Sequence, residues 1–123
     1  MGKKILLIED DEDLQKTMME YLVGEKFEVV GAMDGQIGLE MAQSEAPDAI
    51  LLDVILPKMD GFKVLEAVKT DEKTKHIPVI LLTNLESMED IQRAFEKGAI
   101  AYLVKSDFKL EDVAKKIKEI LKM

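Results

Sequence analysis

The sequence predicts an α/β fold, in which a parallel five-stranded sheet is covered by helices on both faces. Along the whole chain, short apolar runs alternate strictly with amphipathic segments of helical period. The first, third and fourth runs are continuous Val, Ile and Leu, which is typical of strands buried on both faces. Strands that alternate with helices join through right-handed crossovers, which place helices on both sides of a parallel sheet. We therefore expect a doubly wound fold.

The N-terminal half supplies three of the strands and two of the helices. Each helix carries apolar residues at helical spacing, and Gly24 is a plausible end for the first. The three strands are KILLI (4–8), FEVVGA (27–32) and AILLD (49–53). The two helices run over 11–24 and 35–44.

The C-terminal half repeats the alternation. Asp60 and Gly61 read as a turn and cap that open a helix, and Gly98 as the residue that ends the next one. The last helix has the cleanest apolar spacing. The remaining strands are PVILLT (78–83) and AYLVK (101–105). The helices that follow are 87–97, with Met88, Ile91 and Phe95 expected to face inward, and 110–121.

Composition excludes several classes of function. The 123 residues suit one domain with a single core, and 47% hydrophobic with 34% charged residues is ordinary for a globular protein. With no cysteine, disulfides and thiolate chemistry are excluded. A net charge of −8 argues against direct nucleic-acid binding. No apolar run could cross a bilayer and no secretory signal is present, so we expect a cytoplasmic protein without a membrane partner.

Polar residues gather where the predicted strands end. Glu9 and Asp10 follow the first strand, Asp53 ends the third, Thr83 the fourth and Lys105 the fifth. Ligands of open α/β sheets bind beyond the carboxyl ends of the strands. These side chains therefore converge on the edge where chemistry is expected. The opposite strand ends show only Lys3, Lys4, Asp48 and Pro78.

Over its whole length the chain resembles the receiver domain of two-component response regulators, of the chemotaxis-receiver type. The blocks that carry the resemblance are KKILLIEDDEDL, DAILLDVILPKMDGFKVL, PVILLTN and GAIAYLVKSDF, in the order and spacing of that family. The resemblance implies one receiver domain over 1–123 and a flavodoxin-like sheet with the strand order 2-1-3-4-5.

The resemblance also implies a magnesium site. Two carboxylates about 4 Å apart repel by roughly 4 kcal/mol at an effective dielectric near 20, and Mg²⁺ removes this repulsion because it prefers hard oxygen ligands. The implied ligands are the side chains of Glu9, Asp10 and Asp53 and the backbone carbonyl of Ile55. Residues 11–13 fall instead in a first helical turn, where negative charge favours the helix dipole.

By the same resemblance, Asp53 accepts a phosphoryl group from a sensor histidine kinase or phosphotransfer protein, or slowly from acetyl phosphate. Lys105 supplies positive charge to the phosphoryl oxygens and Thr83 a hydroxyl donor. Thr83 and Tyr102 form a switch that changes the surface of the fourth helix, fifth strand and fifth helix. A downstream protein target, or the next member of a phosphorelay, would read that surface.

Four residues near the site bear on its details. In the family the strand-five lysine is commonly followed by proline, but here Ser106 follows it, which affects how Lys105 is aimed. Asn84 replaces the usual small residue after the switch hydroxyl. Ile55 and Leu85 are apolar and cannot position an attacking water, so we predict slow self-dephosphorylation, measured as a long phosphoprotein half-life.

Two alternatives stay open. One is a degenerate receiver that binds its partners without phosphate. The other is a Mg²⁺-dependent phosphohydrolase of the haloacid-dehalogenase kind, although that class carries its aspartate after the first strand in a DxDxT-like motif, which EDDED lacks. We expect no enzyme beyond self-phosphorylation and self-dephosphorylation, and, since the sequence ends soon after the last helix, no output domain.

Overall fold

The computed structural model describes residues 2–54, 56, 59–83, 88–105 and 109–123, and of Thr83 the backbone alone. Within these residues ten elements alternate in the predicted order, with ends that differ from the predicted ones by at most one residue. The strands are β1 (Lys4–Ile8), β2 (Glu28–Ala32), β3 (Ala49–Asp53), β4 (Val79–Thr83) and β5 (Ala101–Val104). The helices are α1 (Glu12–Gly24), α2 (Gly35–Ser44), α3 (Gly61–Thr70), α4 (Met88–Glu96) and α5 (Leu110–Ile120).

All neighbouring strands pair in parallel, in the order β2-β1-β3-β4-β5, as the resemblance implied. The register brings the strand ends level: Ile8 pairs with Ala32 and with Leu52, and Thr83 pairs with Val104. The carboxyl ends of β1, β3, β4 and β5 therefore lie along a single edge of the sheet.

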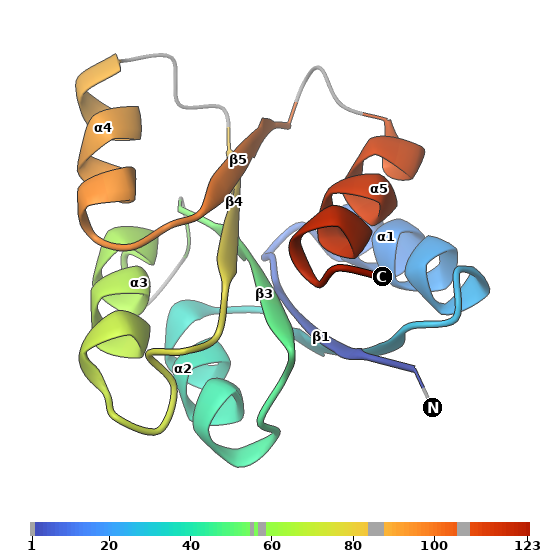
Figure 1. Ribbon diagram of the computed structural model, residues 1–123, viewed down its shortest axis with the longest axis horizontal. Coiled ribbons are helices and arrows are strands. Elements are labelled where there is room, and N and C mark those ends of the chain that lie inside the picture. Colours follow the sequence, from blue (N-terminus) through green and yellow to red (C-terminus); the bar gives the residue numbers. More distant parts are fainter. Residues whose placement is uncertain (1, 55, 57–58, 84–87, 106–108) are drawn as a thin grey trace.

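Helices cover both faces of the sheet. α1 and α5 lie on one face, and α2, α3 and α4 on the other (Figure 1). Alternate residues of the central strands enter opposite cores: Leu51 packs with Met18 of α1 and Ile117 of α5, whereas Leu52 packs with Val64 of α3. All of these side chains are buried. Among the described residues, no helix combines the length and the apolar character that a membrane crossing requires.

Aspartates cap three of the helices, of which only the cap at Asp60 was predicted. The side chain of Asp11 accepts from the N–H of Leu14, that of Asp34 from Ile37 and that of Asp60 from Phe62. Asp11 is the cap of α1, so only Glu12 and Asp13 lie in its first turn. Gly98, after α4, has the positive φ of 109° expected of a residue that ends a helix.

The prediction for the buried side of α4 was wrong for Met88 and Phe95, whereas Ile91 is partly buried. Met88 and Phe95 are 67% and 43% exposed, and Ala94 is the buried residue of the helix. Met88 and Phe95 lie seven residues apart and so on one side of the helix, turned away from the core. The contact of α4 with the core is made by Ala94, which belongs to the cluster that includes Val79 and Leu81 of β4.

Gly61, at the start of α3, has no room for a side chain. A Cβ there would collide with the Cα of Val54 and lie 2.7 Å from the carbonyl oxygen of Asp53. These are backbone atoms that cannot move aside, so we expect Gly61→Ala to lower the free energy of unfolding by about 1–3 kcal/mol. Gly24 meets nothing within 4 Å, and Gly24→Ala is the control, expected to stabilise by about 0.5 kcal/mol. Urea unfolding of both variants measures the difference, and equal midpoints would contradict it.

Candidate metal centre

Three carboxylates meet at the carboxyl edge of the sheet. Glu9 and Asp10 follow β1 and Asp53 is the last residue of β3. One oxygen from each of the three, here called the acidic triad, lies within 4.8 Å of the others. Glu9 is 0% and Asp53 3% exposed, whereas Asp10 is open to solvent. The parallel register places these side chains together, because β1 and β3 are neighbours and end level.

Lys105 follows the edge strand β5, two strands away from β3, and its side chain extends to the acidic triad. Its Nζ lies 2.8 Å from Oε1 of Glu9 and 2.9 Å from Oδ2 of Asp53, where it donates a hydrogen bond. Burial alone would lower the pKa of Lys105, but its bonds to Glu9 and Asp53 outweigh burial and raise that pKa above its ordinary value. The ammonium is therefore charged, and one cation faces two buried carboxylates.

The two carboxylate oxygens of Glu9 have different partners: one accepts a backbone hydrogen bond and the other forms an ion pair. Its Oε2 accepts a hydrogen bond of 3.0 Å from the N–H of Asp11. Its buried Oε1 contacts Lys105, yet no hydrogen bond of good geometry reaches it from the described part of the chain. Burial raises the pKa of Glu9, and the bonds from Lys105 and the Asp11 N–H offset only part of that rise.

The acidic triad fits a magnesium ion. Oxygens at about 2.1 Å from Mg²⁺ lie at most about 4.2 Å apart in octahedral geometry, and the three oxygens of the acidic triad lie within 4.8 Å of one another. The buried Oε1 of Glu9 contacts only the Lys105 ammonium, at 2.8 Å, among the described residues, and a carboxylate oxygen with two lone pairs can still offer one to the ion. Asp10, at the solvent side, leaves a path for a hydrated ion.

Several predicted site residues fall outside the described residues: Ile55, Asn84, Leu85 and Ser106, and with them the side chain of Thr83. Four expectations thus stay predictions: the carbonyl ligand from Ile55, the switch hydroxyl of Thr83, and the effects of Asn84 and of Ser106 on the site. Tyr102 is described: it is 38% exposed, and its ring packs edge to face with Phe95 of α4, at 6.0 Å between centroids and 74° between planes.

Sequence reasoning missed one polar contact of the site. The side chain of Gln15, in α1, donates to the carbonyl oxygens of Glu9 and Ala32. The signal available in the sequence was Gly31, because a glycine inside a strand often marks a close approach by another group.

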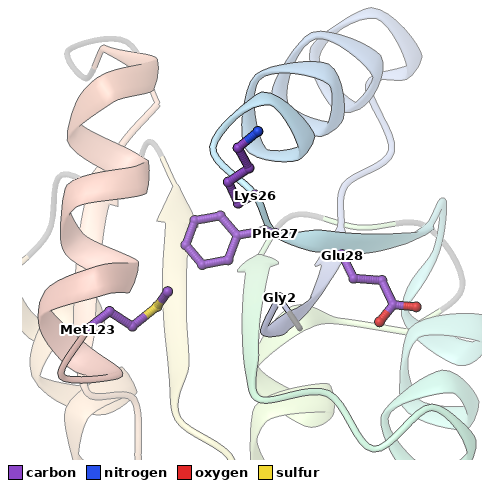
Figure 2. A pocket seen from close by; sticks show the side chains of 5 residues that line it. All are labelled: Gly2, Lys26, Phe27, Glu28 and Met123. Carbon is purple, nitrogen blue, oxygen red and sulfur yellow. The ribbon is translucent and has the colours of Figure 1, made fainter.

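A hollow at the other end of the sheet is unrelated to this site. It has a volume of about 520 Å³ and is lined by Gly2, Lys26, Phe27, Glu28 and Met123, residues at the amino ends of β1 and β2 and after α5 (Figure 2). Polar contacts between neighbouring segments occur at that end as well. Asp48 accepts from the N–H of Lys4, whose Nζ lies 3.3 Å from Glu45.

Glu9→Gln is expected to stabilise the metal-free fold near neutral pH. The folded pKa of Glu9 is raised, so its protonated form contributes stability below the ordinary value of 4.5, and this contribution is lost as pH rises through the folded pKa. Glutamine removes the buried charge and leaves Lys105 paired one to one with Asp53. Urea unfolding of the variant and the native chain, in chelator and across pH, should show a higher midpoint for the variant near neutral pH and no difference in acid. A loss of stability at neutral pH would contradict it.

Comparison with known proteins agrees with this geometry. Residues 5–118 match the response regulator receiver domain. Over 105 residues the chain is 43% identical to the response regulator PleD of Caulobacter vibrioides, covering 85% of this chain but 23% of PleD. The chain thus spans under a quarter of that relative's length.

Solved structures give the same picture. The chemotaxis protein CheY4 of Vibrio cholerae superimposes with a TM-score of 0.90 at 31% identity, over 98% of this chain and 99% of that one. The receiver domain of the sensor histidine kinase PA1611 from Pseudomonas aeruginosa PAO1 gives 0.87 at 28% identity, over 97% of each chain. That structure holds a magnesium ion coordinated in its active site cleft.

Proposed function

This chain belongs to the family of response regulator receiver domains, the phosphoacceptor signalling modules of two-component systems, and we propose that Asp53 is its phosphoacceptor. The observation that carries the proposal is the environment of this one side chain. Asp53 is buried at the end of a central strand, with the ammonium of Lys105 at 2.9 Å and two further carboxylates within 4.8 Å. Because the one ammonium also contacts the buried Glu9, this environment carries an excess of negative charge that a bound cation would neutralise.

Glu9, Asp10 and Asp53 would hold Mg²⁺, together with the carbonyl of Ile55. When bound, the ion neutralises charge on the incoming phosphoryl group and on the carboxylates themselves. Lys105 then no longer has to neutralise both Glu9 and Asp53, and its Nζ can turn to a phosphoryl oxygen. Burial of Glu9 and Asp53 keeps water away from this exchange.

The chemical step is an in-line displacement. A carboxylate oxygen of Asp53 attacks phosphorus, and the phosphorus–nitrogen bond of a phosphohistidine breaks, with its electron pair returning to the imidazole. The donor is a sensor histidine kinase or a phosphotransfer protein, and acetyl phosphate is a slow substitute whose phosphorus–oxygen bond breaks instead. Lys105 and the hydroxyl of Thr83 would take the phosphoryl oxygens.

Thr83 and Tyr102 would convert phosphorylation into a change of surface. Tyr102 of β5 packs on Phe95 of α4, and Thr83 lies at the end of the neighbouring strand β4. Capture of the Thr83 hydroxyl by the phosphoryl group would free space for the tyrosine ring to turn inward. Such a switch biases an existing equilibrium, and a change from 1:99 to 99:1 takes about 5.5 kcal/mol.

The face formed by α4, β5 and α5 would then bind a downstream protein, or pass the signal on within a phosphorelay. We propose a single receiver domain over 1–123, in the cytoplasm, that binds neither nucleic acid nor membrane directly. The net charge of −8 supports the exclusion of nucleic acid. Its own phosphorylation and dephosphorylation would be the only reactions it catalyses.

The test is intact-mass spectrometry after incubation with acetyl phosphate, with Mg²⁺ and with chelator. We expect one phosphoryl group per chain in Mg²⁺ and none in chelator. No addition in either condition would support a phosphate-independent adaptor instead. Multiple turnover on a phosphate ester would support a phosphohydrolase.

A further inference from the structure

Gln15 ties together two strand ends beside the acidic triad. It lies in the second turn of α1, and its Nε2 donates to the carbonyl oxygen of Ala32 at 2.9 Å and to that of Glu9 at 3.2 Å. The N–H of Glu9 donates to the same Ala32 oxygen at 3.0 Å. One side-chain amide thus joins the ends of β1 and β2 at the residue where the acidic segment begins.

The fold makes room for this amide. A Cβ on Gly31 would lie 3.0 Å from both Cδ and Oε1 of Gln15, a separation at which one of the two must move. The backbone of Gln15 is fixed as well, because its N–H donates to the carbonyl of Asp11 at 2.9 Å. The side chain is therefore confined by a strand on one side and by its own helix on the other.

The groups that Gln15 holds are those that aim the metal ligands. The carbonyl of Glu9 belongs to the peptide that links Glu9 to Asp10, so its direction sets where both side chains start. The Oε2 of Glu9 is already bound to the N–H of Asp11, which leaves Oε1 aimed at the site. A rotation of that peptide would move the Glu9 and Asp10 oxygens away from Asp53.

We propose that Gln15 is a positioning residue of the magnesium site, which holds the Glu9–Asp10 peptide through the Glu9 carbonyl; this rests on the proposed function. An amide suits the role because it donates two hydrogen bonds without adding positive charge that would compete with the ion. Groups that orient metal ligands from behind typically change metal affinity by 10–100-fold when replaced.

The test is Mg²⁺ titration by calorimetry on the full chain. Gln15→Met keeps the length of the side chain and removes its donors, and we expect about tenfold weaker Mg²⁺ binding. Gln43→Met is the matched control, since Gln43 also makes a side-chain hydrogen bond, to Asp71, but at an exposed place far from the site. Its affinity should be native. Gly31→Ala displaces the amide without removing a donor and should weaken binding to a smaller degree.

A second readout separates positioning from general damage. At saturating Mg²⁺, phosphorylation of Gln15→Met by acetyl phosphate should return close to the native rate, because the defect lies in affinity. Native affinity in Gln15→Met, or equal weakening in Gln43→Met, overturns the inference. If Gln15→Met does not fold, native affinity in Gly31→Ala overturns it. A native chain that binds no Mg²⁺ overturns the proposed function itself.

Discussion

Asp53→Asn is expected to abolish phosphoryl transfer. An asparagine amide fills the same space and can still accept a hydrogen bond from Lys105, but it is not a nucleophile toward phosphorus at neutral pH. It also removes one of the three carboxylates within 4.8 Å of one another, so Mg²⁺ binding should weaken. After incubation with acetyl phosphate and Mg²⁺, intact-mass spectrometry should show one added phosphoryl group on the native chain and none on the variant.

Asp48→Asn is the matched control for this variant. Asp48 accepts a hydrogen bond of 2.8 Å from the N–H of Lys4 at the opposite edge of the sheet, and an asparagine oxygen can accept it equally. We expect native phosphorylation. A phosphoryl group on Asp53→Asn would show that another carboxylate is the acceptor, with Asp10, the exposed member of the acidic triad, as the first to examine.

Lys105→Met is expected to destabilise the fold when Mg²⁺ is absent and to slow phosphoryl transfer when Mg²⁺ is bound. It removes the cation that contacts Glu9 at 2.8 Å and Asp53 at 2.9 Å, and leaves two buried carboxylates facing each other. Breaking a buried pair by removing one partner costs about 3–5 kcal/mol. Because Lys105 is partly exposed, we expect the free energy of unfolding to fall by about 3 kcal/mol in chelator at neutral pH, as measured by urea unfolding.

Magnesium should reverse most of this loss. With no ammonium competing for the same oxygens, Mg²⁺ should bind Lys105→Met more tightly than the native chain, and an ion at 100 times its dissociation constant adds about 2.7 kcal/mol. Phosphoryl transfer should still fall about 10²–10³-fold, because a fixed charge at the transferred oxygens is missing. Rate assays at saturating Mg²⁺ measure this.

Lys4→Met provides the comparison for Lys105→Met. Lys4 lies 3.3 Å from Glu45 at the other edge, where both side chains are partly exposed, and such pairs contribute about 1 kcal/mol or less. The Lys4→Met variant should lose little stability and should be phosphorylated at the native rate. If Lys105→Met were as stable as Lys4→Met in chelator, the ammonium would not be neutralising the buried carboxylates.

Much of the fold follows from local patterns. Continuous apolar runs predicted the buried strands β1, β3 and β4, because a strand covered on both faces has no polar side. The edge strands β2 and β5 were also found where predicted, although they are only partly buried. Asp60, before α3, and Gly98, after α4, behaved as predicted, because helix ends are decided by the groups a few residues away. The clustering of Glu9, Asp10, Asp53 and Lys105 could be expected as well, since carboxyl ends of parallel strands share an edge.

Other features depend on contacts between distant segments. The strand order came from the resemblance, because a pattern of apolar runs does not say which strands pair. The apolar spacing of α4 predicted that Phe95 faces inward, yet it is 43% exposed and packs against Tyr102 of β5, because the buried side of a helix is set by how the helix docks on the rest of the fold. The shared hold of Lys105 on Glu9 and Asp53, and that of Gln15 on Glu9 and Ala32, likewise arise only when the sheet assembles.

The amino-acid order alone therefore specified which residues form strands and helices, and which charged groups stand at the reactive edge. The folded chain decided how those groups meet: which oxygen of Glu9 is bound, which lacks a hydrogen bond, and which amide holds the peptide behind them. The physical reason is the distance along the chain over which each interaction acts. Periodicity and capping involve residues a few positions apart. The direction of a carboxylate is set by partners much farther away in the sequence: Gln15 and Ala32 are 17 positions apart, and Lys105 and Asp53 are 52 apart.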